Sequence, residues 1–79
     1  MPPRFLTLAD VAEVLSISLS QARALVRSGE LRALQVGGRH QWRVEDAELE
    51  AYIQRMYAAT AQRIEAGLVE DDEDAATTR

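Results

Sequence analysis

The sequence predicts a mostly helical domain with one small β-hairpin, in the order helix, helix, strand, strand, helix. Three observations lead to this prediction. Two short segments near the N-terminus have apolar residues at helical spacing, the segment 31–44 alternates apolar and polar residues, and helical spacing returns from Asp46. With 79 residues the chain has room for one small core. It contains no cysteine, which excludes disulfides and thiolate zinc sites.

The first helix is predicted to begin after Thr7, whose hydroxyl can accept from backbone N–H groups of the first turn. Asp10 lies three residues later, at the position that completes a capping box. Apolar residues then recur at Leu8, Val11, Ala12 and Leu15. Ser16 and Ile17 end this helix.

The second helix is predicted to begin at Ser18, because Gln21 completes a Ser-x-x-Gln capping box. Its inward stripe is Ala22, Leu25 and Val26. Gly29 is a natural stop, since glycine adopts the left-handed conformation at little cost. A link of about three residues between two short helices indicates a helix-turn-helix.

The hairpin is predicted from two alternating runs separated by Gly37-Gly38, which permits a tight reversal. Arg39 and His40 are expected at or near its tip. Trp42 alternates in phase with Val44, so we expect it in the core and not stacked on a base. Its expected neighbours there are Leu34, Val36 and Leu49.

The third helix is predicted from Asp46, with an inward stripe of Leu49, Tyr52, Ile53 and Met56. The stripe thins after Tyr57, and Gly67 is expected to end the helix. Five successive carboxylates at 70–74 repel one another and have little to bury, which predicts disorder. The chain therefore divides into a lead-in at 1–6 with Phe5 and Leu6 tucked into the domain, a winged domain at 7–57, a helical extension at 58–67 and an acidic tail at 68–79.

The charge is unevenly divided along the chain. Residues 1–44 hold six arginines and three carboxylates, whereas residues 45–79 hold three arginines and ten carboxylates, within a total of −4. A basic half can face a polyanion while an acidic half faces away, because the local field decides where a polyanion lands. The N-terminus lacks a signal peptide and no apolar run is long enough to span a membrane, so we expect a cytoplasmic protein.

Three phrases carry a family resemblance: LTLADVAEVLSIS, RSGELRALQVGGRHQWRV and EDAELEAYI. From Leu6 to Ile53, about 60% of the chain, they resemble the excisionase-type helix-turn-helix domains of the MerR superfamily, including small BldC-like bacterial regulators. The resemblance implies a winged helix-turn-helix that binds DNA at the nucleoid. It also implies a hairpin wing that contacts the adjacent minor groove or backbone. The chain departs from the family at 21–24, where Gln-Ala-Arg-Ala replaces the usual Thr-Val-Tyr-Arg.

Candidate DNA-binding residues lie on the second helix and on the hairpin. Ser18 and Ser20 lie where first-turn N–H groups suit a phosphate. Gln21 is a candidate for reading adenine, and Arg23 for guanine or a phosphate. A Gln21 side chain that folds back onto Ser18 would not be free to read a base. The full candidate set is Ser18, Ser20, Gln21, Arg23, Arg27, Arg39, His40 and Arg43, and the competing interpretation is a solvated polar face.

Three functions are compatible with the sequence. The first is a bacterial transcriptional regulator. The second is an excisionase-like recombination directionality factor or an architectural DNA binder, and the third is a protein-interaction adaptor. The expected partner is double-stranded DNA, bound by a homodimer or a head-to-tail oligomer. No catalytic constellation is evident, and no metal, cofactor, membrane or small-molecule effector is expected; His40, for example, has no second strong ligand nearby.

Overall fold

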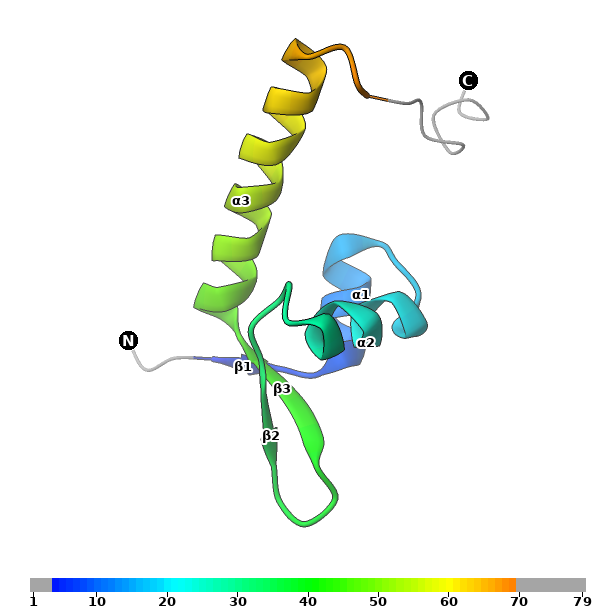
Figure 1. Cartoon of the computed structure of the whole chain (residues 1–79). Helices are drawn as coiled ribbons and strands as arrows, with labels where there is room; N and C mark the ends of the chain where they lie inside the picture. Colours follow the sequence, from blue (N-terminus) through cyan, green and yellow to red (C-terminus); the bar gives the residue numbers. More distant parts are fainter. Residues whose placement is uncertain (1–3, 70–79) are drawn as a thin grey trace.

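The computed structural model describes residues 4–69, and the fold follows the predicted order with one added strand (Figure 1). The elements are β1 (Phe5–Leu6), α1 (Leu8–Leu15), α2 (Leu19–Ser28), β2 (Leu34–Val36), β3 (Gln41–Glu45) and α3 (Asp46–Glu65). The prediction of a mostly helical, winged fold is confirmed. The disorder predicted for 70–74 lies outside the described residues.

Capping boxes begin both short helices, as predicted. The Asp10 N–H donates to Thr7 Oγ1 and the Thr7 N–H donates to Asp10 Oδ2, each over 3.0 Å. Ser18 and Gln21 repeat this arrangement at the start of α2. Between the helices, Ser16 takes the left-handed conformation with φ 55°, and its N–H donates to the last carbonyls of α1. The turn is therefore three residues long, as the sequence indicated.

The sheet has three antiparallel strands in the order β1-β3-β2, one more than expected. Within the predicted lead-in, Phe5 pairs with Glu45 and Leu6 pairs with Val44. Successive side chains of a strand point to opposite faces. Leu6 therefore packs against the core, whereas Phe5 is 48% exposed, and the expectation that both tuck inward was wrong for Phe5.

The register of the hairpin corrects the prediction for Leu34 and Val36. They pair with Arg43 and Gln41, while Gln35 pairs with Trp42. Because paired residues share a face of the sheet, Leu34 and Val36 lie on one face of the sheet and Trp42 lies on the other. They are 44% and 40% exposed, so they are not its core neighbours.

The core forms where α1, α2 and β3 meet the first turns of α3. Its buried members are Leu8, Val11, Ala12, Ala22, Val26, Leu31, Val44, Leu49 and Tyr52. Leu31, between α2 and β2, is fully buried and was not predicted. Trp42 is half-buried and packs against this cluster on the predicted face.

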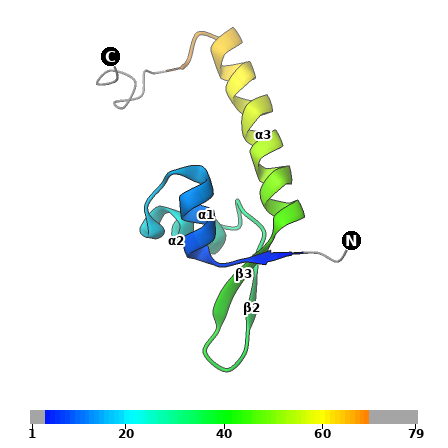
Figure 2. The ribbon, with the colours of Figure 1, turned by 180° about the vertical axis from the view of Figure 1, so that it is seen from behind.

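Helix α3 extends well beyond the core (Figures 1 and 2). Its 20 residues span about 30 Å at 1.5 Å per residue, which contributes to a longest dimension of 45 Å. Leu49 and Tyr52 are its buried residues, and Ile53 packs at the edge of the core. Met56, predicted on the inward stripe, is 37% exposed because this part of α3 extends beyond most of the core residues. Among residues 4–69, no helix is both long and apolar enough to cross a bilayer.

Candidate nucleic-acid interface

The outward face of α2 carries the predicted polar and basic residues. Ala22 and Val26 are buried and Leu25 is half-buried, which turns the rest of the helix toward solvent. The exposed set is Ser20, Gln21, Arg23 and Arg27. Ser20, Arg23 and Arg27 therefore share one face of the helix, whereas Gln21 lies on the flank that borders the apolar groove between α2 and α3.

The first turn of α2 uses part of its polar surface internally. Ser18 Oγ accepts from the Gln21 N–H over 3.0 Å, and Gln21 Oε1 accepts from the Ser18 N–H over 2.9 Å. The hydroxyl of Ser18 and the carbonyl oxygen of Gln21 are therefore engaged in the cap. The amide NH₂ of Gln21 remains a donor that the cap does not use.

The hairpin tip, Gly37–His40, presents two predicted residues to solvent. Gly37 and His40 have φ values of 72° and 54°, and the His40 N–H donates to the Gly37 carbonyl over 3.3 Å. Gln35 Nε2 donates to the His40 carbonyl over 3.2 Å and braces the turn. Arg39 and His40 are exposed at this tip. Sequence reasoning gave Gln35 no role, because the contact depends on the strand register.

Arg43 differs from the other candidates. It lies on β3 and is half-buried, and its Nη1 donates to the Trp42 carbonyl over 2.7 Å. It pairs with Leu34, away from the hairpin tip. The structure therefore separates Arg43 from the exposed tip residues with which the sequence grouped it.

Two arginines outside the candidate set hold the loop after α2 against α3. Arg55 Nη2 donates to the Glu30 carbonyl over 2.9 Å, and its guanidinium lies 5.8 Å from the centre of the Tyr52 ring. Arg32 forms an ion pair with Glu48 over 3.1 Å. An exposed pair of this kind adds little stability. Arg55 thus reaches from α3 to the loop, and Arg32 reaches from the loop to the first turn of α3.

The carboxyl of Asp10, at the start of α1, is held in its charged form. The Thr7 N–H donates to it, and this bond, helped by the Thr7 hydroxyl, lowers the pKa of Asp10. The charges of Arg4 and Arg43 lower the pKa further. Among the described residues, no cluster of three His, Cys, Asp or Glu side chains is placed to bind a metal ion.

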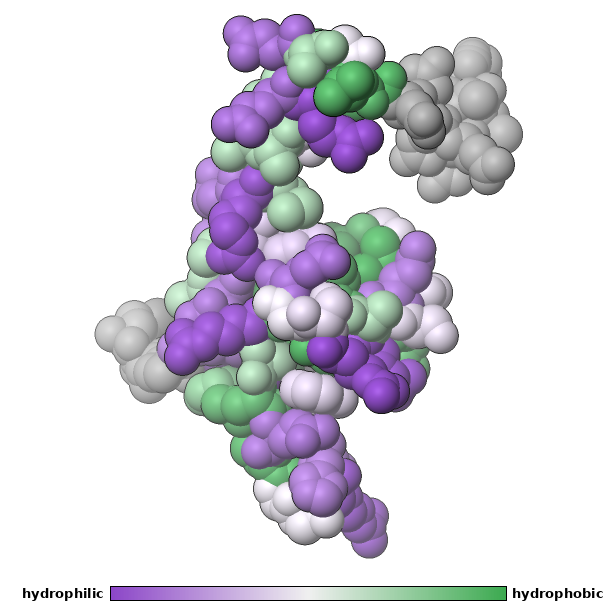
Figure 3. Space-filling model, in the orientation of Figure 1, coloured by the Kyte–Doolittle hydropathy of each residue, from purple (hydrophilic) through white to green (hydrophobic). Residues whose placement is uncertain are grey.

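Hydrophilic side chains gather over α2 and again at the hairpin tip on the face shown in Figure 3. Two helices joined by a three-residue turn, followed by a hairpin beside them, define a winged helix-turn-helix domain. The profile of a helix-turn-helix domain family matches residues 5–57, about two thirds of the chain, and the chain belongs to this family. It is a DNA-binding helix-turn-helix protein. Comparisons with curated proteins and with solved structures gave no match.

Proposed function

We propose that this chain is a bacterial, sequence-specific DNA-binding protein that acts as a transcriptional regulator. Helix α2 enters the major groove, and the β2–β3 hairpin lies on the adjacent backbone or minor groove. The observation that supports this most directly is the joint exposure of Arg23 and Arg27 on α2 and of Arg39 at the hairpin tip. Exposed arginines of this kind neutralise duplex phosphates.

On α2, each candidate residue has a distinct role in the proposal. Recognition helices present their N-terminal half to base edges. Arg23 contacts guanine or a phosphate, and Gln21 contacts adenine through the amide that the cap leaves available. Ser18 and Ser20 place first-turn N–H groups beside a phosphate. Arg27, in the last turn of α2, holds the helix to the backbone.

On the hairpin, Arg39 is the principal contact. An arginine at an exposed tip suits a narrow, electronegative minor groove. His40 lies beside it and extends the contact to the backbone. Arg43 acts from the base of the wing, where its bond to the Trp42 carbonyl fixes its direction.

One domain of this size makes few phosphate contacts. If about four phosphates are neutralised, the slope of log K against log salt concentration is about −3.6. Such binding weakens as the salt concentration rises, and a single copy with so few contacts would occupy its site poorly. The proposal therefore includes two or more copies on one DNA site. The proposal places the protein in the cytoplasm, associated with the nucleoid, where several copies can bind one DNA site.

Selection from a randomised duplex library, repeated at low and near-physiological salt, tests the proposal. We expect a short recurring motif at both salt concentrations. Retention of DNA without a motif would replace the regulator with an architectural role, whereas an integrase gene beside this one would favour the excisionase-like role. Absence of binding at low salt would overturn DNA binding and leave the protein-interaction adaptor, whose partner a pull-down with the intact chain would recover.

A further inference from the structure

Leu19, the first residue of α2, is a large apolar side chain on an otherwise polar stretch of the helix. It is 46% exposed, and it is not one of the apolar residues that pack against the core. Ser18 and Ser20 on either side of it are exposed as well. The residues that α2 buries, Ala22 and Val26, begin one turn later. The packing of the core therefore gives little reason for an apolar side chain at this position.

The spacing of residues on α2 places Leu19 on the face proposed to meet DNA. Successive residues turn by about 100° around a helix, so residues four apart lie on the same face. Arg23 follows Leu19 by four residues, Arg27 follows Arg23 by four, and both arginines are exposed. Leu19, Arg23 and Arg27 therefore form one row along the outward face of α2.

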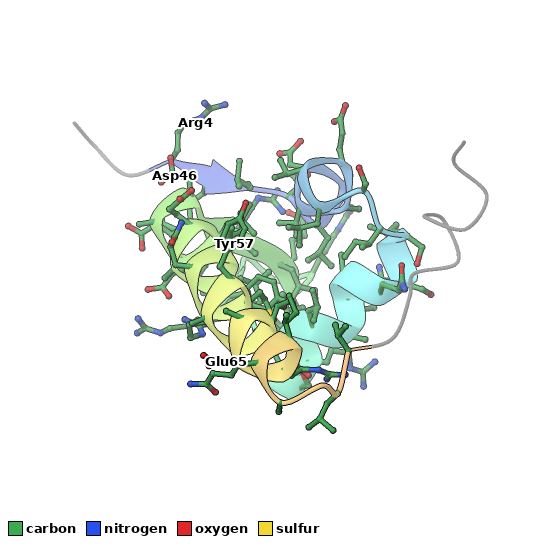
Figure 4. All side chains as sticks on the ribbon, turned by 90° about the horizontal axis from the view of Figure 1, so that it is seen from above. Arg4, Asp46, Tyr57 and Glu65 are labelled. Atoms are coloured by element: carbon green, nitrogen blue, oxygen red, sulfur yellow. The ribbon has the colours of Figure 1, made fainter. Side chains whose placement is uncertain are left out.

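Gln21 marks the opposite side of the helix. It lines the apolar groove between α2 and α3 together with Tyr57, which is labelled on α3 in Figure 4 with α2 beside it. Gln21 follows Leu19 by two residues, which corresponds to a turn of about 200°. Leu19 therefore points away from the groove and from α3, to the side on which the arginines of α2 lie.

The chemistry of the major groove selects a partner for an apolar side chain. Recognition helices present their N-terminal residues to base edges. Those edges carry hydrogen-bond donors and acceptors and one apolar group, the C5 methyl of thymine. A leucine side chain has no hydrogen-bonding group, so packing it against a donor or an acceptor would leave that polar group without a partner. The thymine methyl is the base feature that suits a leucine in the first turn of α2.

We infer that Leu19 reads thymine in the bound duplex, by packing its side chain against the C5 methyl group in the major groove. The inference rests on the proposed function and deepens it, because it assigns one position of the DNA site to an apolar contact. Arg23, one turn farther along the same row, contacts a neighbouring guanine or phosphate. Burial of one methyl group against the leucine strengthens binding about fourfold.

Replacement of single thymines by deoxyuridine tests this contact. Uracil keeps the base pairing and the O4 acceptor of thymine and lacks only the C5 methyl. Each thymine of the duplex recovered by selection is replaced in turn, and fluorescence anisotropy measures the affinity of wild type and of Leu19→Ala. We expect one thymine per bound chain at which the replacement weakens wild-type binding about fourfold and leaves Leu19→Ala unchanged. Effects of uracil on the duplex itself act on both chains equally, so the difference between the chains isolates the contact.

Leu34→Ala is the matched control. Leu34 is also a leucine, it is 44% exposed, and it lies on β2, outside the recognition helix. Its replacement should leave the sensitivity to uracil as it is in wild type. Leu19→Met keeps a large apolar side chain and should retain that sensitivity. All three variants should melt close to wild type, because both leucines are exposed.

The possible outcomes separate this inference from the proposed function. Equal losses in wild type and Leu19→Ala at every thymine, or a selected motif without thymine, would overturn the contact of Leu19 and leave the proposed function intact. Loss of the sensitivity in Leu34→Ala as well would also overturn it, because the effect would then not be specific to α2. Absence of binding to any duplex at low salt would overturn the proposed function itself.

Discussion

Ser18 and Gln21 hold each other at the start of α2 by two reciprocal hydrogen bonds of 3.0 and 2.9 Å. The helix proposed to enter the major groove is therefore fixed by two residues that are also candidates for DNA contact. One side chain, Gln21, serves the fold through its oxygen and remains available to DNA through its nitrogen. Substitutions can separate the two roles.

Gln21→Glu should preserve the fold and weaken DNA binding. A glutamate accepts from the Ser18 N–H as the glutamine does, and its charge suits a helix N-terminus. It lacks the amide donors and repels phosphate, so we expect an affinity loss of about 1 kcal/mol, the order of one hydrogen bond. Thermal melting and fluorescence anisotropy with the selected duplex measure the two effects. A variant that binds as tightly as wild type would remove Gln21 from the interface.

Ser18→Ala should have the opposite profile. It removes the hydroxyl that accepts from the Gln21 N–H, and loss of such a cap costs about 1 kcal/mol of unfolding free energy. Once corrected for the folded fraction, affinity for DNA should change little, because the backbone N–H groups remain. Urea titration gives the stability, and Ser20→Ala, which lies outside the cap, serves as the control.

Arg39→Ala should weaken binding to all duplexes about equally. The side chain lies at the hairpin tip and is proposed to contact the sugar-phosphate backbone from the minor groove. Removal of one such contact should reduce the magnitude of the salt slope by about one. Arg63→Ala is the matched control, because Arg63 carries the same charge on the distant end of α3. Identical salt slopes for wild type and Arg39→Ala would exclude the proposed wing contact.

Leu31→Ala and Leu34→Ala test the register of the hairpin and the position of the core. Leu31 is fully buried, so its truncation should cost about 2–5 kcal/mol of unfolding free energy. Leu34 lies on the outer face of the sheet, and its truncation should change stability by about 0.5 kcal/mol or less. Urea unfolding followed by Trp42 fluorescence measures both. Equal losses would contradict the register.

Acidification should remove the stability that the charged Asp10 carboxyl gives to the start of α1. The pKa of Asp10 is lowered in the folded chain, first by the Thr7 N–H that donates to it. A depressed folded pKa stabilises the fold above the unfolded pKa, and this contribution is lost as pH falls through the folded value. Asp10→Asn removes the titrating group, so its melting temperature should fall less on acidification. Melting curves from neutral pH to below the ordinary range of aspartate compare the two chains. Parallel curves would contradict the prediction.

Local signals in the sequence were sufficient to predict the helices and where they begin and end. Both capping boxes, the left-handed glycine at Gly29 and the turn at Ser16 depend on neighbours within a few residues. Relations between distant segments were missed. The pairing of Phe5 with Glu45 joins opposite ends of the domain, and no local pattern indicates it.

The hairpin too was predicted only where its features depend on local sequence. Alternation within each run was evident, but the phase of β2 relative to β3 is set by the four-residue tip, which pairs Val36 with Gln41. For the candidate site, helical spacing predicted the exposure of Arg23 and Arg27. The different position of Arg43 and the bracing contact of Gln35 required the three-dimensional register. The DNA contacts themselves remain predictions.

The uninterrupted α3 also constrains how the chain can change in length. Each residue inserted between Tyr57 and Ile64 would advance the end of the helix by about 1.5 Å and rotate it by about 100°. Two added residues would turn Ile64 to the far side of the helix, whereas seven would return it almost to its original bearing. The bearing of Ile64 relative to the winged domain therefore depends on the helical phase of an insertion and not simply on its size.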